Sequence, residues 1–122
     1  MQGMEETDAG RANSPGQSPL EAAADRAALA AILEAHGRHA EARATLGQAL
    51  ATFEQVLGSD HYLVGVTLER LAGAVATSGA HDEAAALYAR ALTIYERILG
   101  RSHPRTAACR ANRDKALAVP HP

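Results

Sequence analysis

The segment that decides the fold is GAHDEAAALYARALTIYERILGRSHP, residues 79–104. Its apolar residues recur every three or four positions, at Tyr88, Ala91, Leu92, Tyr95 and Leu99. A second apolar row lies beside the first, at Leu87, Ala91, Ile94 and Ile98. This spacing is that of an α-helix with two adjacent apolar faces, which predicts packing against both a partner helix and a neighbouring repeat. Gly79 precedes the apolar rows and Gly100 follows them, and glycine is common where helices end.

The same pattern occurs 42 residues earlier in the chain. Residues 20–61 overlay residues 62–103 without a gap, with thirteen identical pairs that include two glycine pairs and two histidine pairs. Residues from Pro104 onward begin a third copy. A fixed period of roughly 20–50 residues is typical of arrays in which each repeat buries its apolar face against the next.

Each copy predicts a helix, a tight turn, a second helix and a loop. Gly37 and Gly79 are expected to close the first helices, where a left-handed residue is needed. The second helix of copy one repeats the apolar row with Leu46, Ala49, Leu50, Phe53 and Leu57. The first helices carry their own apolar residues, Leu29 and Leu33 in copy one and Leu68, Leu71 and Val75 in copy two.

These patterns predict an all-α fold, a short α-solenoid of antiparallel helix pairs with two hairpins and a C-terminal capping helix. Ser18-Pro19-Leu20-Glu21 forms a capping box with proline at the first helical position, so ordered structure should begin there. The glycine, serine, proline and acidic residues of positions 1–17 predict a disordered tail. The expected domain is 18–118, with repeat one at about 20–61, repeat two at about 62–103, a capping helix at about 104–118 and a short tail at 119–122.

Charge and composition exclude several classes of protein. The net charge of −2 implies no general attraction to nucleic acid or membranes, although residues 1–60 are acidic overall and the chain from Arg90 onward is basic. The sequence contains neither a secretory signal nor an apolar run long enough to span a membrane. Cys109 is the single cysteine, which fits a reducing compartment. We therefore expect a cytoplasmic protein.

The segment from Gly79 to Pro104 resembles the tetratricopeptide repeat, specifically the 42-residue variety of kinesin light chains. The matching residues are Gly79, Glu83-Ala84, Leu87-Tyr88, Arg90-Ala91-Leu92, Ile94, Glu96, Leu99-Gly100 and His103-Pro104. Copy one keeps Gly37, Glu41-Ala42, Ala49-Leu50, Glu54 and Leu57-Gly58. The resemblance extends over about residues 20–118.

The resemblance implies that the chain binds a peptide or protein segment in a concave groove lined by the first helices. Family members often place an asparagine there to hold the ligand backbone. The matching positions are Ala28, Arg70 and Asn112, so only the third copy has the asparagine. The candidate groove residues are Glu34, Glu69, Arg70, Gly73, Thr77, Asn112 and Lys115.

Other chemistry has little support in the sequence. Repeated histidines such as His39 and His81 are one repeat apart, too far to share a metal ion, and are interpreted as turn or cap residues. No catalytic motif is present, so we expect neither enzyme activity nor a cofactor. Cys109 is interpreted as a small buried apolar residue, although Arg105 or Arg113 could lower its pKa and raise its reactivity.

Two functions remain from this reasoning. The first is a protein-interaction module whose partner is a protein or peptide, possibly acidic. The second is an assembly element that stacks head to tail with itself or with a longer repeat protein, because its acidic start and basic end are complementary. We expect no membrane partner, and nucleic acid is disfavoured because no aromatic stacking platform accompanies the basic residues.

Overall fold

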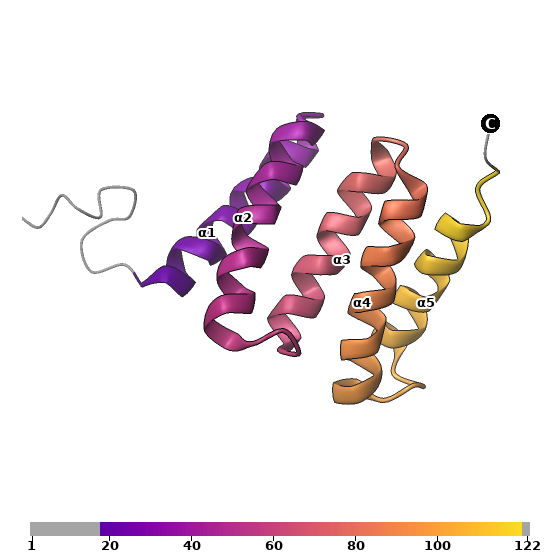
Figure 1. Ribbon diagram of the computed structural model, residues 1–122. Coiled ribbons are helices and arrows are strands. Elements are labelled where there is room, and N and C mark those ends of the chain that lie inside the picture. The colour runs from indigo at the N-terminus through magenta and orange to yellow at the C-terminus, as the bar shows by residue number, and fades with distance from the viewer. Residues whose placement is uncertain (1–17, 121–122) are drawn as a thin grey trace, which may run out of the picture.

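A computed structural model describes residues 18–120 of the chain as a row of helices (Figure 1). The helices are α1 (Pro19–Ala35), α2 (His39–Leu57), α3 (Tyr62–Thr77), α4 (His81–Leu99) and α5 (Pro104–Leu117). The tail expected at residues 1–17 and the last two residues of the expected C-terminal tail lie outside the described part.

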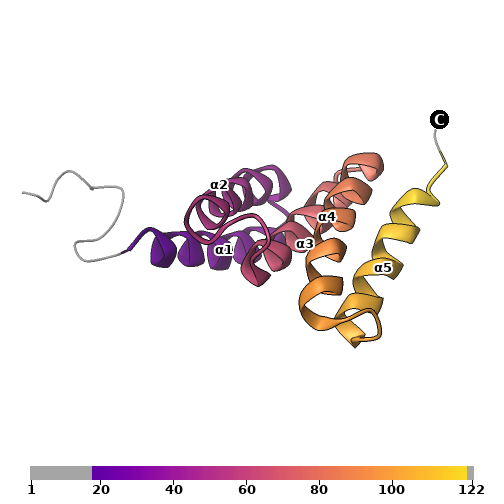
Figure 2. The same cartoon turned by 60° about the horizontal axis from the view of Figure 1, so that its bottom comes forward.

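Successive helices pack against one another as antiparallel neighbours, from α1 on α2 to α4 on α5. Figure 2 shows that the axes of α4 and α5 are steeply inclined to those of α1 and α2. Because every second helix reverses direction, α1 and α3 run the same way along one side of the row. The predicted short solenoid of antiparallel helix pairs is confirmed.

The start of α1 is fixed by the capping box that the sequence predicts. The Glu21 amide donates to the Ser18 hydroxyl oxygen at 3.1 Å, and the Ser18 amide donates to the Glu21 carboxylate at 2.9 Å. Two backbone donors of the first turn are thereby satisfied. The starts of α3 and α5 are capped by His61 and His103, whose Nδ1 atoms accept from amides two residues later at 3.0 Å. For this pair of repeated histidines, the interpretation as turn or cap residues is confirmed.

The tight turns within the two hairpins have the same geometry. Gly37 has a φ of +76° and Gly79 a φ of +95°, a region that residues with a side chain rarely adopt. At the first turn, the Arg38 amide donates to the Leu33 carbonyl at 2.9 Å, and the Gly37 amide donates to the Glu34 carbonyl at 3.0 Å. This pair of bonds is the Schellman motif, which satisfies carbonyls left free at a helix end.

Most of the apolar rows predicted for the second helices are buried. Tyr95 and Ala91 are inaccessible to solvent, and Leu46 and Phe53 are only 2% and 4% exposed. Leu71 touches both of the clusters into which the core divides, so it joins the first hairpin to the second.

Two predicted core residues are exposed instead. Leu29 on α1 is 47% exposed and Ile98 on α4 is 48% exposed. Leu71, the counterpart of Leu29 in the second repeat, is partly buried against the core cluster that contains Leu46 of α2. Within residues 18–120 no helix precedes α1, so nothing covers Leu29 in the same way. Ile98 occupies the last turn of α4, just before the chain leaves the helix at Gly100.

Two helix glycines provide a matched test of this packing. A Cβ atom at Gly65 would lie 3.0 Å from Tyr95 Cε1 and 3.1 Å from Ile94 Cγ2, whereas one at Gly47 would meet nothing within 4 Å. Gly65→Ala should lower the free energy of unfolding by about 1 kcal/mol, because overpacking outweighs the helix preference of alanine. Gly47→Ala should raise it by about 0.5–1 kcal/mol. Urea unfolding followed by circular dichroism measures both, and equal effects of the two variants would contradict this packing.

Candidate functional site

A trough runs between α1 and α3 along their shared direction. On α3 it is lined by Leu63, Val66, Arg70, Gly73 and Thr77, which recur every three or four residues on one helix face. On α1 it is lined by Leu20, Ala24, Ala27, Ala31 and Glu34, with the same spacing. The trough consists of two hollows that share Ala27, Ala31 and Arg70.

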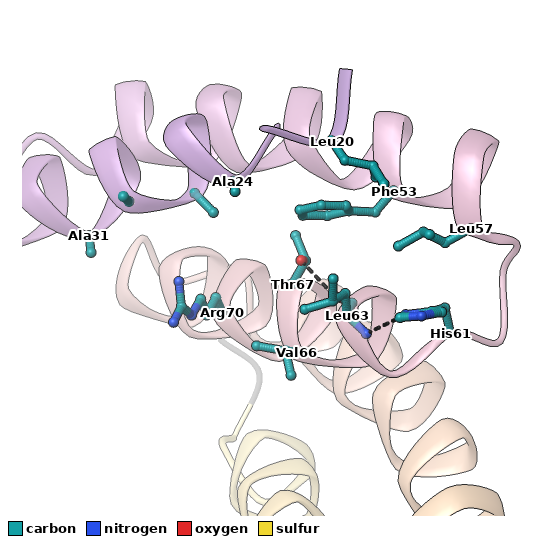
Figure 3. Close-up of a pocket in the computed structure, with 12 residues that line it drawn as sticks. Leu20, Ala24, Ala31, Phe53, Leu57, His61, Leu63, Val66, Thr67 and Arg70 are labelled. Atoms are coloured by element: carbon teal, nitrogen blue, oxygen red, sulfur yellow. Dashed lines mark hydrogen bonds between the residues drawn. The ribbon is translucent and has the colours of Figure 1, made fainter. Parts of the chain in front are cut away.

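The first hollow, called here the apolar cleft, lies beside the amino-terminal halves of α1 and α3. It has a volume of about 590 Å³. Figure 3 shows Leu20, Phe53 and Leu57 on one side of it and Leu63, Val66 and Arg70 on the other. The full lining is Leu20, Ala24, Ala27, Ala28, Ala31, Phe53, Leu57, His61, Leu63, Val66, Thr67 and Arg70.

The polar side chains of the apolar cleft are largely occupied within the protein. The Thr67 hydroxyl donates to the Leu63 carbonyl at 2.7 Å. His61 Nδ1 accepts from the Leu63 amide at 3.0 Å. The cleft therefore offers mainly hydrocarbon surface to a ligand, and Arg70 supplies its charge.

The second hollow, called here the polar hollow, lies beside the carboxyl-terminal halves of α1 and α3. It has a volume of about 510 Å³ and is lined by Ala27, Ala30, Ala31, Glu34, Leu46, Arg70, Gly73, Ala74 and Thr77. Five of these nine residues are alanine or glycine. Glu34 from α1 and Arg70 from α3 bring opposite charges to it, and the two form no ion pair with each other in the described structure.

Arg70 differs from most arginines of the described chain. Arg43 of α2 and Arg90 of α4 pair across these two helices with Glu83 and Glu54, each at 2.6 Å. Arg97 of α4 pairs at 2.6 Å with Asp60 of the loop between α2 and α3. Arg70 is exposed and has no ion-pair or hydrogen-bond partner among residues 18–120. Its guanidinium group is therefore available to an anionic group in the trough.

Glu34 is held in place by a histidine from the next helix. Its Oε1 atom lies 2.8 Å from His39 Nδ1. Its Oε2 atom is buried and has no hydrogen-bond partner in the structure. The Thr77 hydroxyl, in the same hollow, donates to the Gly73 carbonyl at 2.9 Å. Its oxygen can still accept a hydrogen bond from a ligand.

The structure brings together four of the seven candidate groove residues, Glu34, Arg70, Gly73 and Thr77, which all line the polar hollow. The other three line neither hollow. Asn112 and Lys115 are on α5, which lies at the opposite end of the row from α1 (Figure 1). Glu69 is on α3, but its carboxylate is engaged with α4 and α5.

Glu69 belongs to a network that joins the last three helices. The Tyr95 hydroxyl donates to Glu69 Oε1 at 2.7 Å, and Arg105 donates to the same oxygen at 3.2 Å. The Arg105 guanidinium carbon also lies 5.3 Å from the Tyr95 ring centroid and 5.8 Å from that of Tyr62. Burial, and then the hydrogen bond to Glu69, raise the pKa of the Tyr95 hydroxyl. This network was not predicted from the sequence.

The apolar half of the trough was likewise not predicted from the sequence. The signal was present, since Leu63 and Val66 stand seven and four positions before Arg70, on the same helix face. Leu20 and Ala24 line the same cleft from α1. The missing part was the contribution of Phe53 and Leu57, which depends on how α2 packs against both first helices.

Cys109 is inaccessible to solvent, and its thiol lies 3.5 Å from the Tyr88 carbonyl oxygen. Burial, reinforced by Glu69, raises the pKa of the Cys109 thiol to about 11, and the nearby arginines only partly oppose this shift. The alternative in which Arg105 or Arg113 activates Cys109 is therefore wrong, because desolvation outweighs the charges.

The described residues contain neither a metal-binding cluster nor a membrane-spanning helix. Residues 18–120 contain no group of three or more histidine, cysteine, aspartate or glutamate residues placed to hold a metal ion. None of the five helices is long and apolar enough to cross a membrane.

Comparison with known families matches residues 20–97 to the tetratricopeptide repeat. The match begins in the first turn of α1 and ends near the end of α4, so it includes both hairpins and both sides of the trough. The chain belongs to the tetratricopeptide repeat family. Proteins built from this repeat generally act as protein-interaction modules. No curated protein matches the chain.

The buried thiol of this tetratricopeptide repeat protein predicts a loss of stability in alkali. An unfolded cysteine titrates near 9.0, while the folded thiol of Cys109 titrates near 11. Because the folded pKa is raised, the contribution of the neutral thiol is complete below about pH 9 and is lost as the pH rises toward 11. Between pH 8 and 11 the free energy of unfolding should fall by roughly 2 kcal/mol more in the wild type than in Cys109→Ala. Urea titrations across this range test it, and parallel pH profiles would contradict it.

Proposed function

We propose that this protein binds an extended segment of a partner protein in the trough between α1 and α3. One observation supports the proposal. The apolar cleft, with a volume of about 590 Å³, is lined by Arg70, an arginine that has no partner within the described structure. Protein ligand sites commonly combine a mainly apolar concave surface with a few polar groups that fix orientation.

The apolar cleft supplies the anchor in this proposal. Leu63 is 41% exposed, while Phe53 is nearly buried and lies deeper in the lining. A leucine, isoleucine or aromatic side chain from the partner would cover this surface. Burial of such a side chain contributes about 1.5–3 kcal/mol to binding before the costs of association are subtracted.

Arg70 supplies the polar contact that sets the position of the segment. An aspartate, a glutamate or a terminal carboxylate can accept two parallel hydrogen bonds from a guanidinium group. Among residues 18–120 no carboxylate pairs with Arg70. The proposed partner segment therefore carries an apolar side chain followed along the trough by an acidic group, in agreement with the acidic partner considered from the sequence.

The closer relationship to the kinesin light chain variety is part of the same proposal. It is supported by the 42-residue period and by the residues from Gly79 to Pro104. Asn112 and Lys115 remain proposed contacts only for a partner long enough to continue from the trough to α5. Glu69 is better explained as a structural residue that links α3 to α4 and α5.

Head-to-tail stacking receives less support. In the second repeat, Leu68 and Ala72 of α3 are fully buried in the core that α4 completes. The equivalent positions on α5 are Arg110 and Asp114, which are already paired with Glu96 and Arg113. A further helix would have to cover these paired charges rather than an apolar row.

Selection from a library of random 12-residue peptides displayed on phage, followed by calorimetry with the selected peptides, tests the proposed function. Leu63→Asp and Arg70→Glu should each weaken binding at least tenfold, because one removes the apolar surface and the other reverses the charge. Matched controls are Ile98→Asp, which alters a side chain 48% exposed on α4, and Arg101→Glu, which alters an exposed loop arginine.

The controls should change affinity by less than twofold. The proposal fails if the library yields no peptide that binds, or if the selected peptides bind the trough variants and the controls equally well. Circular dichroism of each variant establishes that a weakened affinity does not come from unfolding.

A further inference from the structure

The polar hollow contains a carboxylate that the protein itself does not fully satisfy. His39 contacts Glu34 Oε1 at 2.8 Å, whereas Oε2 is buried without a donor. A buried acceptor without a hydrogen bond has lost its contact with water and gained no partner in exchange, which is unfavourable. Although this oxygen is buried, the Glu34 side chain as a whole is 29% exposed and lines the polar hollow.

The rest of the hollow has room for a side chain from outside. Its lining includes Ala27, Ala30, Ala31, Gly73 and Ala74, whose side chains fill little space. The aliphatic part of a long side chain could lie along these residues, as lysine and arginine stems do on apolar surfaces. The terminal torsion of glutamate is broad, so the Glu34 carboxylate can turn to present an oxygen to such a group.

The charges of the hollow argue for a cation at the Glu34 end. Glu34 and Arg70 line the same space without pairing with each other. The Thr77 hydroxyl donates its proton to the Gly73 carbonyl, so toward a ligand it acts as an acceptor. Glu34 and Thr77 together therefore offer acceptors, whereas the donors of the hollow are concentrated on Arg70.

We propose that the polar hollow receives a lysine or arginine side chain of the bound segment, with its charged end at the Glu34 carboxylate and the Thr77 hydroxyl. The inference rests on the proposed function and extends it, since it names a third element of the ligand. Along the trough, the order of the ligand groups is apolar at Leu63, acidic at Arg70 and basic at Glu34. Once the carboxylate turns toward the hollow, an ammonium or guanidinium group supplies the donor that Oε2 lacks.

The same phage library of random 12-residue peptides tests this inference with the full chain. Peptides selected on the wild type should carry a lysine or arginine at a fixed spacing from an acidic residue. If the selected peptide carries arginine, the arginine is first replaced by lysine. The lysine peptide is then compared with a peptide that has norleucine at the same position, which removes the charge and keeps most of the aliphatic stem.

Calorimetry compares both peptides on the wild type and on Glu34→Gln. The Glu34→Gln variant should lower the affinity for the basic peptide about tenfold and the affinity for the norleucine peptide by less than twofold. Glu54→Gln is the matched control. The Glu54 side chain is 30% exposed and paired with Arg90, and it lines neither hollow. This control should leave both affinities unchanged.

A second variant separates ligand binding from a purely structural role. His39→Ala removes the protein partner of Glu34 and should preserve the preference for the basic peptide. If His39→Ala and Glu34→Gln lower the affinities for both peptides to the same extent, Glu34 acts only by holding the turn and the inference is wrong.

The two proposals fail in different ways. Peptides that lack a basic residue but lose affinity with Leu63→Asp and Arg70→Glu would overturn the basic subsite and leave the trough as the binding site. Peptides that are insensitive to all of these variants would overturn both.

Discussion

The structure depends on a single constraint, which is that each second helix must cover two first helices at once. Leu46 of α2 lies in one cluster with Leu33 of its own hairpin and Ala74 of the next. Tyr95 and Ala91 of α4 are sealed from solvent within the larger cluster that extends to α5. Because the second helices fill the space behind the first ones, α1 and α3 are left side by side with one face each toward solvent. The trough is a consequence of this arrangement.

The fold could be predicted from the sequence because its determinants are local and occur twice. Helix periodicity, the capping box at Ser18 and the glycines of the turns act over a few residues, and the 42-residue repeat displays each of them a second time. The two residues wrongly predicted to be in the core, Leu29 and Ile98, lie on the first helix of the array and in the last turn of α4. Leu29 matches Leu71 in sequence, but burial depends on a preceding helix, which periodicity alone does not reveal.

The site was predicted in part for a related reason. Glu34, Arg70, Gly73 and Thr77 follow from the face of a helix and could be placed without coordinates. Glu69 is the neighbour of Arg70 in sequence, yet it turns to Tyr95 and Arg105 on two later helices. The apolar cleft needs Phe53 and Leu57 from α2 beside residues of α1 and α3. Such contacts between distant segments depend on tertiary packing, and a one-dimensional pattern contains little information about them.

The shared direction of α1 and α3 has an electrostatic consequence. Aligned peptide dipoles give each helix about half a positive charge at its start and half a negative charge at its end. Both starts lie at the Leu20 and Leu63 end of the trough, and both ends lie near Glu34 and Thr77. The backbone thus creates a potential gradient along the trough, independent of any side chain. A peptide bound in one direction along the trough and the same peptide bound in the opposite direction would differ in energy. The backbone of the two helices therefore favours one chain direction of the ligand.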